Sequence, residues 1–115
     1  MKRLSAPLLL ALLLVAGAAN AAGDADAGKT KAAACAACHG PDGNAGIDPQ
    51  YPRLAGQYRD YLAKALHEYK SGDRKNPIMA GFAGTLSDAD IEDLASYFSS
   101  LQDSKLTDLH GKVSQ

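Results

Sequence analysis

Two cysteines and a histidine fall within five consecutive residues, and no other feature of the sequence limits the fold as strongly. Cys35 and Cys38 are three residues apart, and His39 follows directly. On one helical turn, residues three apart point to the same side, so both thiols can reach one bound group. The chain has no other cysteine. It can therefore build neither a disulfide framework nor a zinc site made of cysteines alone.

The order C-x-x-C-H is typical of covalent haem attachment. Each thiol would add across a vinyl group of the same haem to give a thioether, and the His39 imidazole would lie under the iron. A C-x-x-C pair alone would also suit a redox dithiol, a zinc site or a local disulfide. A redox dithiol needs a βαβ context, and a zinc site needs two further ligands. A local disulfide would leave His39 without a role. The sequence thus predicts one haem c attached through Cys35 and Cys38, with His39 on the iron.

A second iron ligand is expected from Met79, since the only other methionine is Met1. Met79 lies in a Pro- and Gly-containing segment, which could fold over the open side of the haem and present a thioether sulfur. His/Met ligation raises the reduction potential and suits electron transfer. Alternatively, Met79 only fills a gap in the core. His67 is a rival ligand that we expect to be partly exposed on a helix, and His110 belongs to a polar tail.

The first 21 residues have the features of a secretory signal peptide. Lys2 and Arg3 form a basic start, residues 8–15 are an aliphatic run, and small residues precede a cleavage point after Ala21. The alternative is a retained anchor, but the apolar stretch is shorter than the about 20 residues that span a bilayer. We expect a cleaved signal at residues 1–21 and a periplasmic protein. Export fits haem attachment, which takes place outside the bacterial cytoplasm.

The remaining residues, 22–115, are expected to form one domain that ends in a polar tail at 102–115. Removal of Lys2 and Arg3 leaves 10 basic against 13 acidic residues, a net charge of −3. This balance argues against a nucleic-acid partner, which requires a basic surface. A domain of this size has a thin core and usually depends on a cofactor, metal or disulfide for stability.

Apolar residues at helical spacing, bounded by stop signals, predict three main helices. They cover about residues 26–38, residues 57–69 and the segment from Ser87 to Leu101. The segments between them, 40–56 and 73–85, are rich in Gly and Pro and are expected to be loops. No segment alternates apolar and polar residues over the length of a strand. We therefore expect an all-α fold whose three helices and long loops wrap around one covalent haem.

The third helix has the clearest local signals. Ser87 is a good N-cap, and Asp90 stands at the position that completes a capping box. Leu86 and Ile91 are spaced to form a hydrophobic staple across this cap. The helix is therefore expected to begin at Ser87, whatever its tertiary contacts.

Four segments of the sequence together resemble the class I cytochrome c family. The resemblance implies the cytochrome c fold. The resemblance is closest to the short bacterial cytochromes whose fold forms each half of cytochrome c4. It covers nearly all of residues 24–101. The segments that carry it are Cys35–Gly40, Tyr51–Gln57, Asn76–Met79 and Leu86–Leu101.

The resemblance implies several contacts. The first and last helices would cross near Gly28, with Tyr97 or Phe98 packed there, because a glycine lets two backbones approach closely. The carbonyl of Pro52 would accept a hydrogen bond from the ring of His39, which would fix the ring and tune its basicity. Leu54 would pack on a haem face. Many family members bind a haem propionate through tryptophan, which this chain lacks. The available substitutes, which could equally be solvated surface side chains, are Gln57, Arg59, Arg74 and Asn76.

The resemblance implies a soluble periplasmic electron carrier, not an enzyme, that moves single electrons between redox partners. Membrane or soluble redox proteins, such as quinol–cytochrome c reductase or a terminal oxidase or reductase, are the expected partners. Two alternatives stay open. A haem enzyme or gas-binding sensor requires an open or displaceable sixth iron position. An electron-transfer subunit of a larger oxidase or dehydrogenase complex would form a stable assembly.

Charge is unevenly distributed along the chain. Residues 51–79 hold six basic and three acidic side chains (+3), and residues 80–115 hold two basic and six acidic ones (−4). This distribution predicts a weakly basic rim near the second helix that could steer an acidic partner. An ordinary mixed surface is the alternative.

Overall fold

Five helices, and no strand, make up the described part of the chain, residues 22–44 and 48–106 of a computed structural model. The predicted signal peptide and His110 lie outside the described residues. The all-α prediction is confirmed within them. In chain order, the helices are α1 (Ala25–Lys31), α2 (Ala33–His39), α3 (Arg59–Ser71), α4 (Pro77–Ala83) and α5 (Asp88–Ser100).

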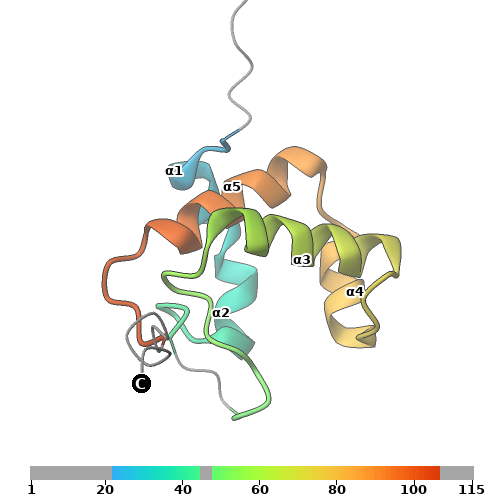
Figure 1. Cartoon of the computed structure of the whole chain (residues 1–115), viewed down its shortest axis with the longest axis horizontal. Helices are drawn as coiled ribbons and strands as arrows, with labels where there is room; N and C mark the ends of the chain where they lie inside the picture. Colours follow the sequence, from blue (N-terminus) through green and yellow to red (C-terminus); the bar gives the residue numbers. More distant parts are fainter. Residues whose placement is uncertain (1–21, 45–47, 107–115) are drawn as a thin grey trace, which may run out of the picture.

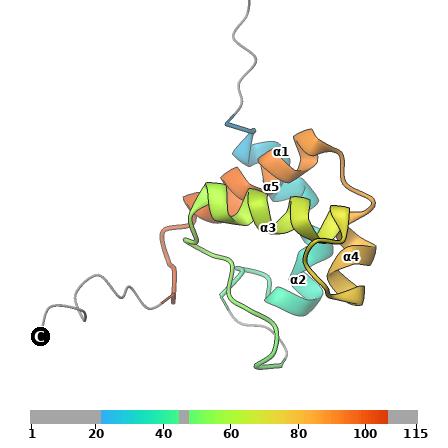
Figure 2. The same ribbon diagram turned by 45° about the vertical axis from the view of Figure 1, so that its right-hand side comes forward.

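The helices are arranged around α5, which contacts both α1 and α3. In Figures 1 and 2, α3 lies alongside α5, while α2 and α4 both extend from the same side of this pair. α2 continues from α1, and α4 packs against α3. No helix in the described ranges is both long enough and apolar enough to cross a membrane.

The predicted helix over 26–38 is two helices, α1 and α2, separated at Ala32. α1 begins where the Asp24 side chain accepts hydrogen bonds from the backbone N–H groups of Asp26 and Ala27. At the break, the N–H of Cys35 donates to the Ala32 carbonyl at 2.9 Å. This bond spans three residues instead of four, so the backbone winds more tightly there. The sequence has no Gly or Pro at this point and gave no signal of the break.

The prediction of a loop over residues 73–85 was wrong, because this segment contains α4. Asn76 caps this helix and Pro77 occupies its first turn. Proline favours the first turn of a helix, where no N–H is needed and its fixed φ is already helical. The prediction treated Pro77 only as a residue that ends helices. α3 begins at Arg59, two residues later than expected, and ends at Ser71, where its C-cap Gly72 has a left-handed φ of 87°.

The capping box predicted for α5 is present. The Asp90 N–H donates to the Ser87 hydroxyl at 3.1 Å, and the Ser87 N–H donates to the Asp90 carboxylate at 2.9 Å. Leu86 packs against the cluster that contains Ile91, as the predicted staple requires. Local sequence chemistry therefore fixes the start of α5.

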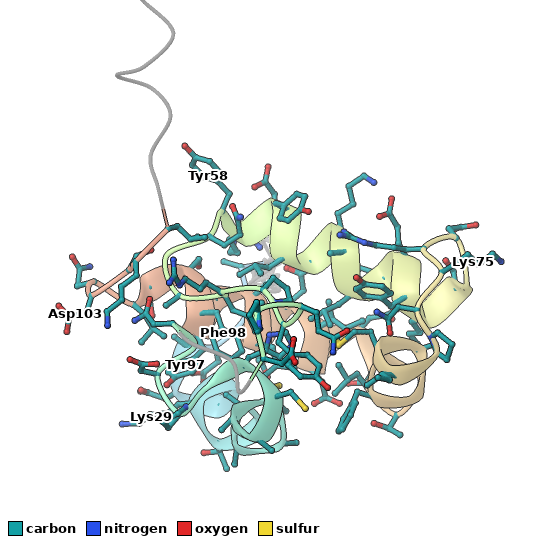
Figure 3. All side chains as sticks on the ribbon, turned by 90° about the horizontal axis from the view of Figure 1, so that it is seen from below. Lys29, Tyr58, Lys75, Tyr97, Phe98 and Asp103 are labelled. Carbon is teal, nitrogen blue, oxygen red and sulfur yellow. The ribbon has the colours of Figure 1, made fainter. Side chains whose placement is uncertain are left out.

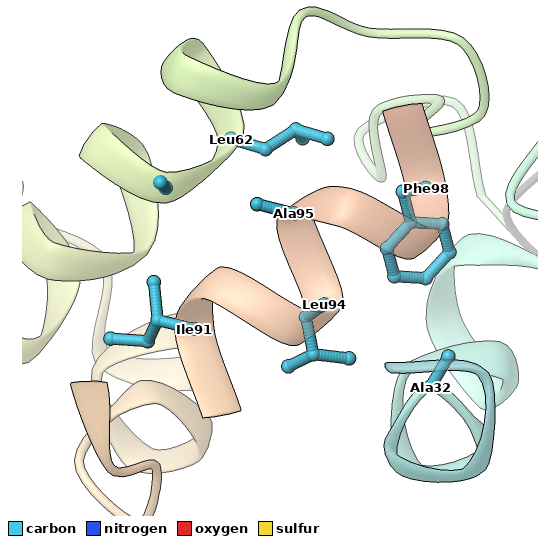
Figure 4. Close-up of a cluster of buried hydrophobic side chains, with 7 residues drawn as sticks. Ala32, Leu62, Ile91, Leu94, Ala95 and Phe98 are labelled. Carbon is cyan, nitrogen blue, oxygen red and sulfur yellow. The ribbon is translucent and has the colours of Figure 1, made fainter. Parts of the chain in front are cut away.

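The core is small and centred on α5. Figure 4 shows apolar side chains of α3, α5 and the α1–α2 junction gathered around it. Ile91 and Ala95 are fully buried. Burial of a side chain such as Ile91 contributes about 1.5–3 kcal/mol. The members of the cluster are Ala32, Leu62, Ala63, Ile91, Leu94, Ala95 and Phe98.

α1 and α5 cross at Gly28, as the resemblance implies. A Cβ at Gly28 would lie 2.0 Å from the Asp93 carbonyl oxygen and 2.8 Å from Cβ of Tyr97. Of the two aromatic residues expected there, it is Tyr97 that meets Gly28. Phe98, its neighbour in Figure 3, instead lies over Gly43, where a Cβ would come within 3.0 Å of the ring. The crossing is therefore too close for any side chain at Gly28.

The segment after α5, which includes the start of the predicted polar tail at 102–115, is bonded to the rest of the fold. The Ser104 hydroxyl donates to the Ala55 carbonyl at 2.6 Å. The amide of Asn44, a residue that is only 2% exposed, bonds to both Asp103 and Lys105. These long-range bonds are a property of the folded chain, and no local pattern in the sequence indicates them.

Candidate functional site

α2 brings the predicted haem-binding residues together. Cys35 and Cys38 lie on this helix, both are free thiols, and both are partly buried. His39 is the last residue of α2 and is only 6% exposed. Gly40 then turns the chain away with a φ of 86°, a conformation that favours glycine. One short helix therefore presents two thiols and one imidazole.

The His39 ring is held by a hydrogen bond to the loop before α3. Its Nδ1 lies 2.8 Å from the carbonyl oxygen of Pro52, which is the contact that the resemblance implies. A carbonyl oxygen can only accept, so Nδ1 must carry the proton. The lone pair of a neutral imidazole is then on Nε2, the atom left to bind a metal. The ring of Tyr51 stands edge-on to His39, with centroids 6.3 Å apart.

The Cys35 thiol is not poised to act as the nucleophile of a redox dithiol. Burial raises the pKa of the Cys35 thiol above its usual value, and the nearby Cys38 raises it further. Cys35 packs against the apolar core cluster, which accounts for this desolvation. Reactive dithiols depend on a lowered pKa that favours the thiolate. The raised pKa of Cys35 therefore argues against a reactive dithiol at this site.

Met79 lies on α4, the second helix that extends from the α3–α5 pair (Figure 2). It is partly buried. Its helix neighbours Ile78 and Phe82 are large, apolar and about half exposed, at 54% and 47%. An apolar surface of this kind suits contact with a porphyrin. Whether Met79 binds iron stays a prediction.

The free thiols, the available Nε2 and the apolar side chains around Met79 fit haem c. In the described residues, no cluster of three or more His, Cys, Asp or Glu side chains could hold a metal ion.

The four residues considered for the propionates have protein partners. Gln57 accepts a hydrogen bond from the Tyr58 N–H at 2.8 Å, and Arg59 pairs with Glu92 at 2.8 Å. The guanidinium of Arg74 lies 5.0 Å from the centre of the Tyr69 ring. Asn76 caps α4. Leu54 packs partly buried against the core cluster. The roles of these residues toward a haem stay predictions.

His67 is a partly exposed side chain on α3, as expected. Its two ring nitrogens lie 3.9 Å from the carboxylates of Asp88 and Glu92 on α5. Such contacts are typical of a surface ion pair when the imidazole is protonated. The His67 ring thus lies beside two carboxylates of α5.

The predicted basic rim is partly neutralised. Three of its six basic residues form ion pairs with acidic side chains. Exposed pairs of this kind leave a mixed surface potential. The three pairs are Arg59–Glu92, Lys64–Glu68 and Lys70–Asp88.

Sequence reasoning missed two groups of residues. One is the Asn76 cap, which the Asn-Pro pair before a helical segment could have indicated. The other is Asn44 with Arg53, whose Nε donates to the Asn44 carbonyl at 2.7 Å. Arg53 directly follows Pro52, so this contact helps to fix the loop that supports His39.

Comparison with known proteins gives a consistent result. A profile of the cytochrome c family matches residues 25–102. Cytochrome c4 of Pseudomonas aeruginosa is 51% identical over 100 residues, which is 87% of this chain and 49% of that protein. Cytochrome c-554(548) of Halomonas halodenitrificans is 48% identical over 82 residues, which is 69% of this chain and 98% of that protein.

A solved structure supports the same assignment. Reduced recombinant cytochrome c4 from Pseudomonas stutzeri superposes with a TM-score of 0.65 at 48% identity, covering 70% of this chain and 47% of that one. The chain thus spans about half the length of the cytochrome c4 relatives that it matches. The family match makes haem c, with its iron, the cofactor. On the profile match, the sequence identities and the shared all-α fold, the chain belongs to the cytochrome c family.

Proposed function

We propose that the chain is a periplasmic carrier of single electrons. One observation on α2 carries this proposal. The buried His39 ring donates from Nδ1 to the Pro52 carbonyl, which leaves Nε2 to bind a metal, and two free thiols lie beside it on the same helix. When bound, haem c supplies an iron that gains or loses one electron without making or breaking bonds to a substrate. The protein is accordingly proposed not to be an enzyme.

Each residue has a proposed task. Cys35 and Cys38 attach the haem as thioethers and prevent its loss. His39 binds the iron through Nε2, while the Pro52 carbonyl fixes the ring and increases its basicity. Met79 would supply a second protein ligand to the iron through its sulfur, and this ligation would raise the reduction potential and exclude exogenous ligands.

The location and partners are part of the same proposal. Residues 1–21 would direct export and be removed, leaving a mature domain at 22–115. The electron donor and acceptor would be redox proteins of the membrane or periplasm, such as a quinol–cytochrome c reductase and a terminal oxidase or reductase. Mass spectrometry of protein from a periplasmic extract tests the cleavage, and the expected first residue is Ala22.

Optical spectroscopy of haem-loaded protein tests the ligation. We expect low-spin spectra, a weak far-red sulfur-to-iron band in the oxidised form and no response to carbon monoxide. Met79→Ala should remove the far-red band and allow carbon monoxide to bind. The matched control is His67→Ala, which should leave both properties unchanged. Ready carbon monoxide binding by the unmodified protein would reject the carrier and favour an enzyme or gas sensor.

A further inference from the structure

The Asn76 side chain bonds directly to the backbone of Met79. Its Oδ1 accepts hydrogen bonds from the N–H groups of Ile78 and Met79, both at 3.0 Å. Asn76 itself is extended, with φ of −159° and ψ of 110°, and Pro77 follows in the first helical turn. The amide oxygen therefore satisfies two N–H groups that have no partner within the helix. One of these groups belongs to the proposed iron ligand.

α4 packs against α3, but it is short and only slightly buried. It is seven residues long, and Ala83 is its one buried residue. Helices of this length are marginal on their own, because nucleation is costly and few backbone bonds follow. By contrast, α5 is thirteen residues long and buries four side chains. The cap thus contributes a larger share of the stability of α4 than a cap does in a long, buried helix.

We propose that Asn76 is a positioning residue that holds Met79 against the iron by capping α4. This inference rests on the proposed ligation by Met79. It assigns Asn76 an acceptor role through Oδ1, which is distinct from a donor role at a propionate through Nδ2. Loss of the cap would let the first turn of α4 open, and Met79 would leave the iron more often while the rest of the fold stays intact.

Competition with imidazole measures this opening. Imidazole binds ferric iron only when Met79 has left, so its apparent affinity is proportional to the open fraction. Loss of an N-cap to alanine typically changes a helix equilibrium by roughly fivefold. We therefore expect Asn76→Ala to bind imidazole about fivefold more tightly. The far-red sulfur-to-iron band should also be lost at a lower temperature than the helical signal.

Two conservative variants separate the cap from a propionate contact. Asn76→Asp and Asn76→Ser keep a side-chain oxygen that can accept from Ile78 and Met79. An aspartate cannot donate a hydrogen bond and would repel a propionate, but it suits the positive end of a helix. Both variants should therefore restore imidazole affinity to within about twofold of the unmodified protein.

A matched control removes the same kind of cap from another helix. Ser87→Ala deletes the N-cap of α5, where Ser87 also bonds one backbone N–H in the first turn. It should lower global stability while leaving imidazole affinity unchanged. Hydrogen exchange gives an independent readout, because the Ile78 and Met79 amides should exchange about fivefold faster in Asn76→Ala and return to normal in Asn76→Asp.

Each outcome decides the inference. Tighter imidazole binding in Asn76→Ala, rescue by Asn76→Asp and no effect of Ser87→Ala would support it. Unchanged affinity in Asn76→Ala, failure of Asn76→Asp to rescue, or an equal effect of Ser87→Ala would overturn it. If the unmodified protein itself lacks the sulfur-to-iron band, the proposed ligation fails, and this inference falls with it.

Discussion

The Nδ2 of Asn44 donates a hydrogen bond of 2.7 Å to the backbone oxygen of Asp103, 59 residues further along the chain. The Oδ1 of the same amide accepts from the N–H of Lys105 at 2.8 Å. The side-chain amide of Asn44 thus bonds to one carbonyl and one N–H of the backbone after α5. Asn44, together with the Ser104 bond to Ala55, joins this segment to the loop that supports His39.

Asn44→Ala is expected to destabilise the domain by about 2 kcal/mol. The change would leave the Asp103 carbonyl and the Lys105 N–H without their partner in a partly buried site, and each lost bond of this kind costs about 1 kcal/mol. Urea unfolding followed by circular dichroism measures the loss. Gln50→Ala, at an exposed position of the nearby loop, should stay within about 0.5 kcal/mol. Equal stability of the two variants would contradict this reading of Asn44.

Gly28→Ala is expected to cost about 3 kcal/mol or to prevent folding. Its Cβ would lie 2.0 Å from the Asp93 carbonyl oxygen, so the α1–α5 crossing would have to open, and overpacking of this kind is costly. Thermal unfolding measures the effect. Lys29→Ala, an exposed position on the same helix, is the control and should change stability by about 0.5 kcal/mol or less. A stable Gly28→Ala protein would mean that the crossing is looser than described.

The Lys31–Asp93 ion pair at 2.7 Å should make stability depend on pH in the acid range. The Lys31 ammonium, followed by the Asp24 N–H, lowers the pKa of Asp93 below its ordinary value of 3.8. Because the folded state resists protonation of Asp93, the stabilisation is complete above about pH 4 and is lost as the pH falls below it. Asp93→Asn should therefore lower stability at pH 7 and flatten its decline in acid.

A double-mutant cycle isolates this pair. Lys31→Met alone and Asp93→Asn alone should each destabilise the domain at pH 7, and the double variant should lose less than the sum of the two. Strict additivity would show that Asp93 acts through its bond to the Asp24 N–H instead.

Covalent attachment of haem should need only one of the two thiols. Cys35→Ala and Cys38→Ala are each expected to retain haem through the remaining thioether during acid–acetone extraction. The double variant should release it completely. Mass spectrometry of the extracted protein measures retained haem directly. Retention by the double variant would exclude Cys35 and Cys38 as the attachment points.

Features that depend on neighbouring residues could be predicted from the sequence. The cap at Ser87, the apolar face of α5 and the grouping of Cys35, Cys38 and His39 all follow from spacing along one helix. α4 was missed although its signal was local, because Pro77 was read as a helix breaker when its position after Asn76 made it a helix starter.

Features that join distant segments could not be predicted from local patterns. Asn44 is a turn-forming residue by propensity, and only the folded chain brings it to Asp103 and Lys105. The contact between His39 and Pro52 was implied only by the family resemblance, because a main-chain carbonyl leaves no trace in the sequence. Tertiary packing therefore decides which residues of one loop form hydrogen bonds with residues of another.

The crossing at Gly28 joins the first helix of the domain to its last. In the proposed export, the chain would emerge from its N-terminus, so α1 and the Cys35–His39 segment would reach the periplasm well before α5. Before α5 has emerged, the Cys35–His39 segment cannot be buried against a completed core. A haem-attaching enzyme would therefore act on this segment as an unfolded peptide. A chain truncated before Asp88 should accordingly accept haem while its α1 amides exchange freely, and failure of that truncation to accept haem would place attachment after folding.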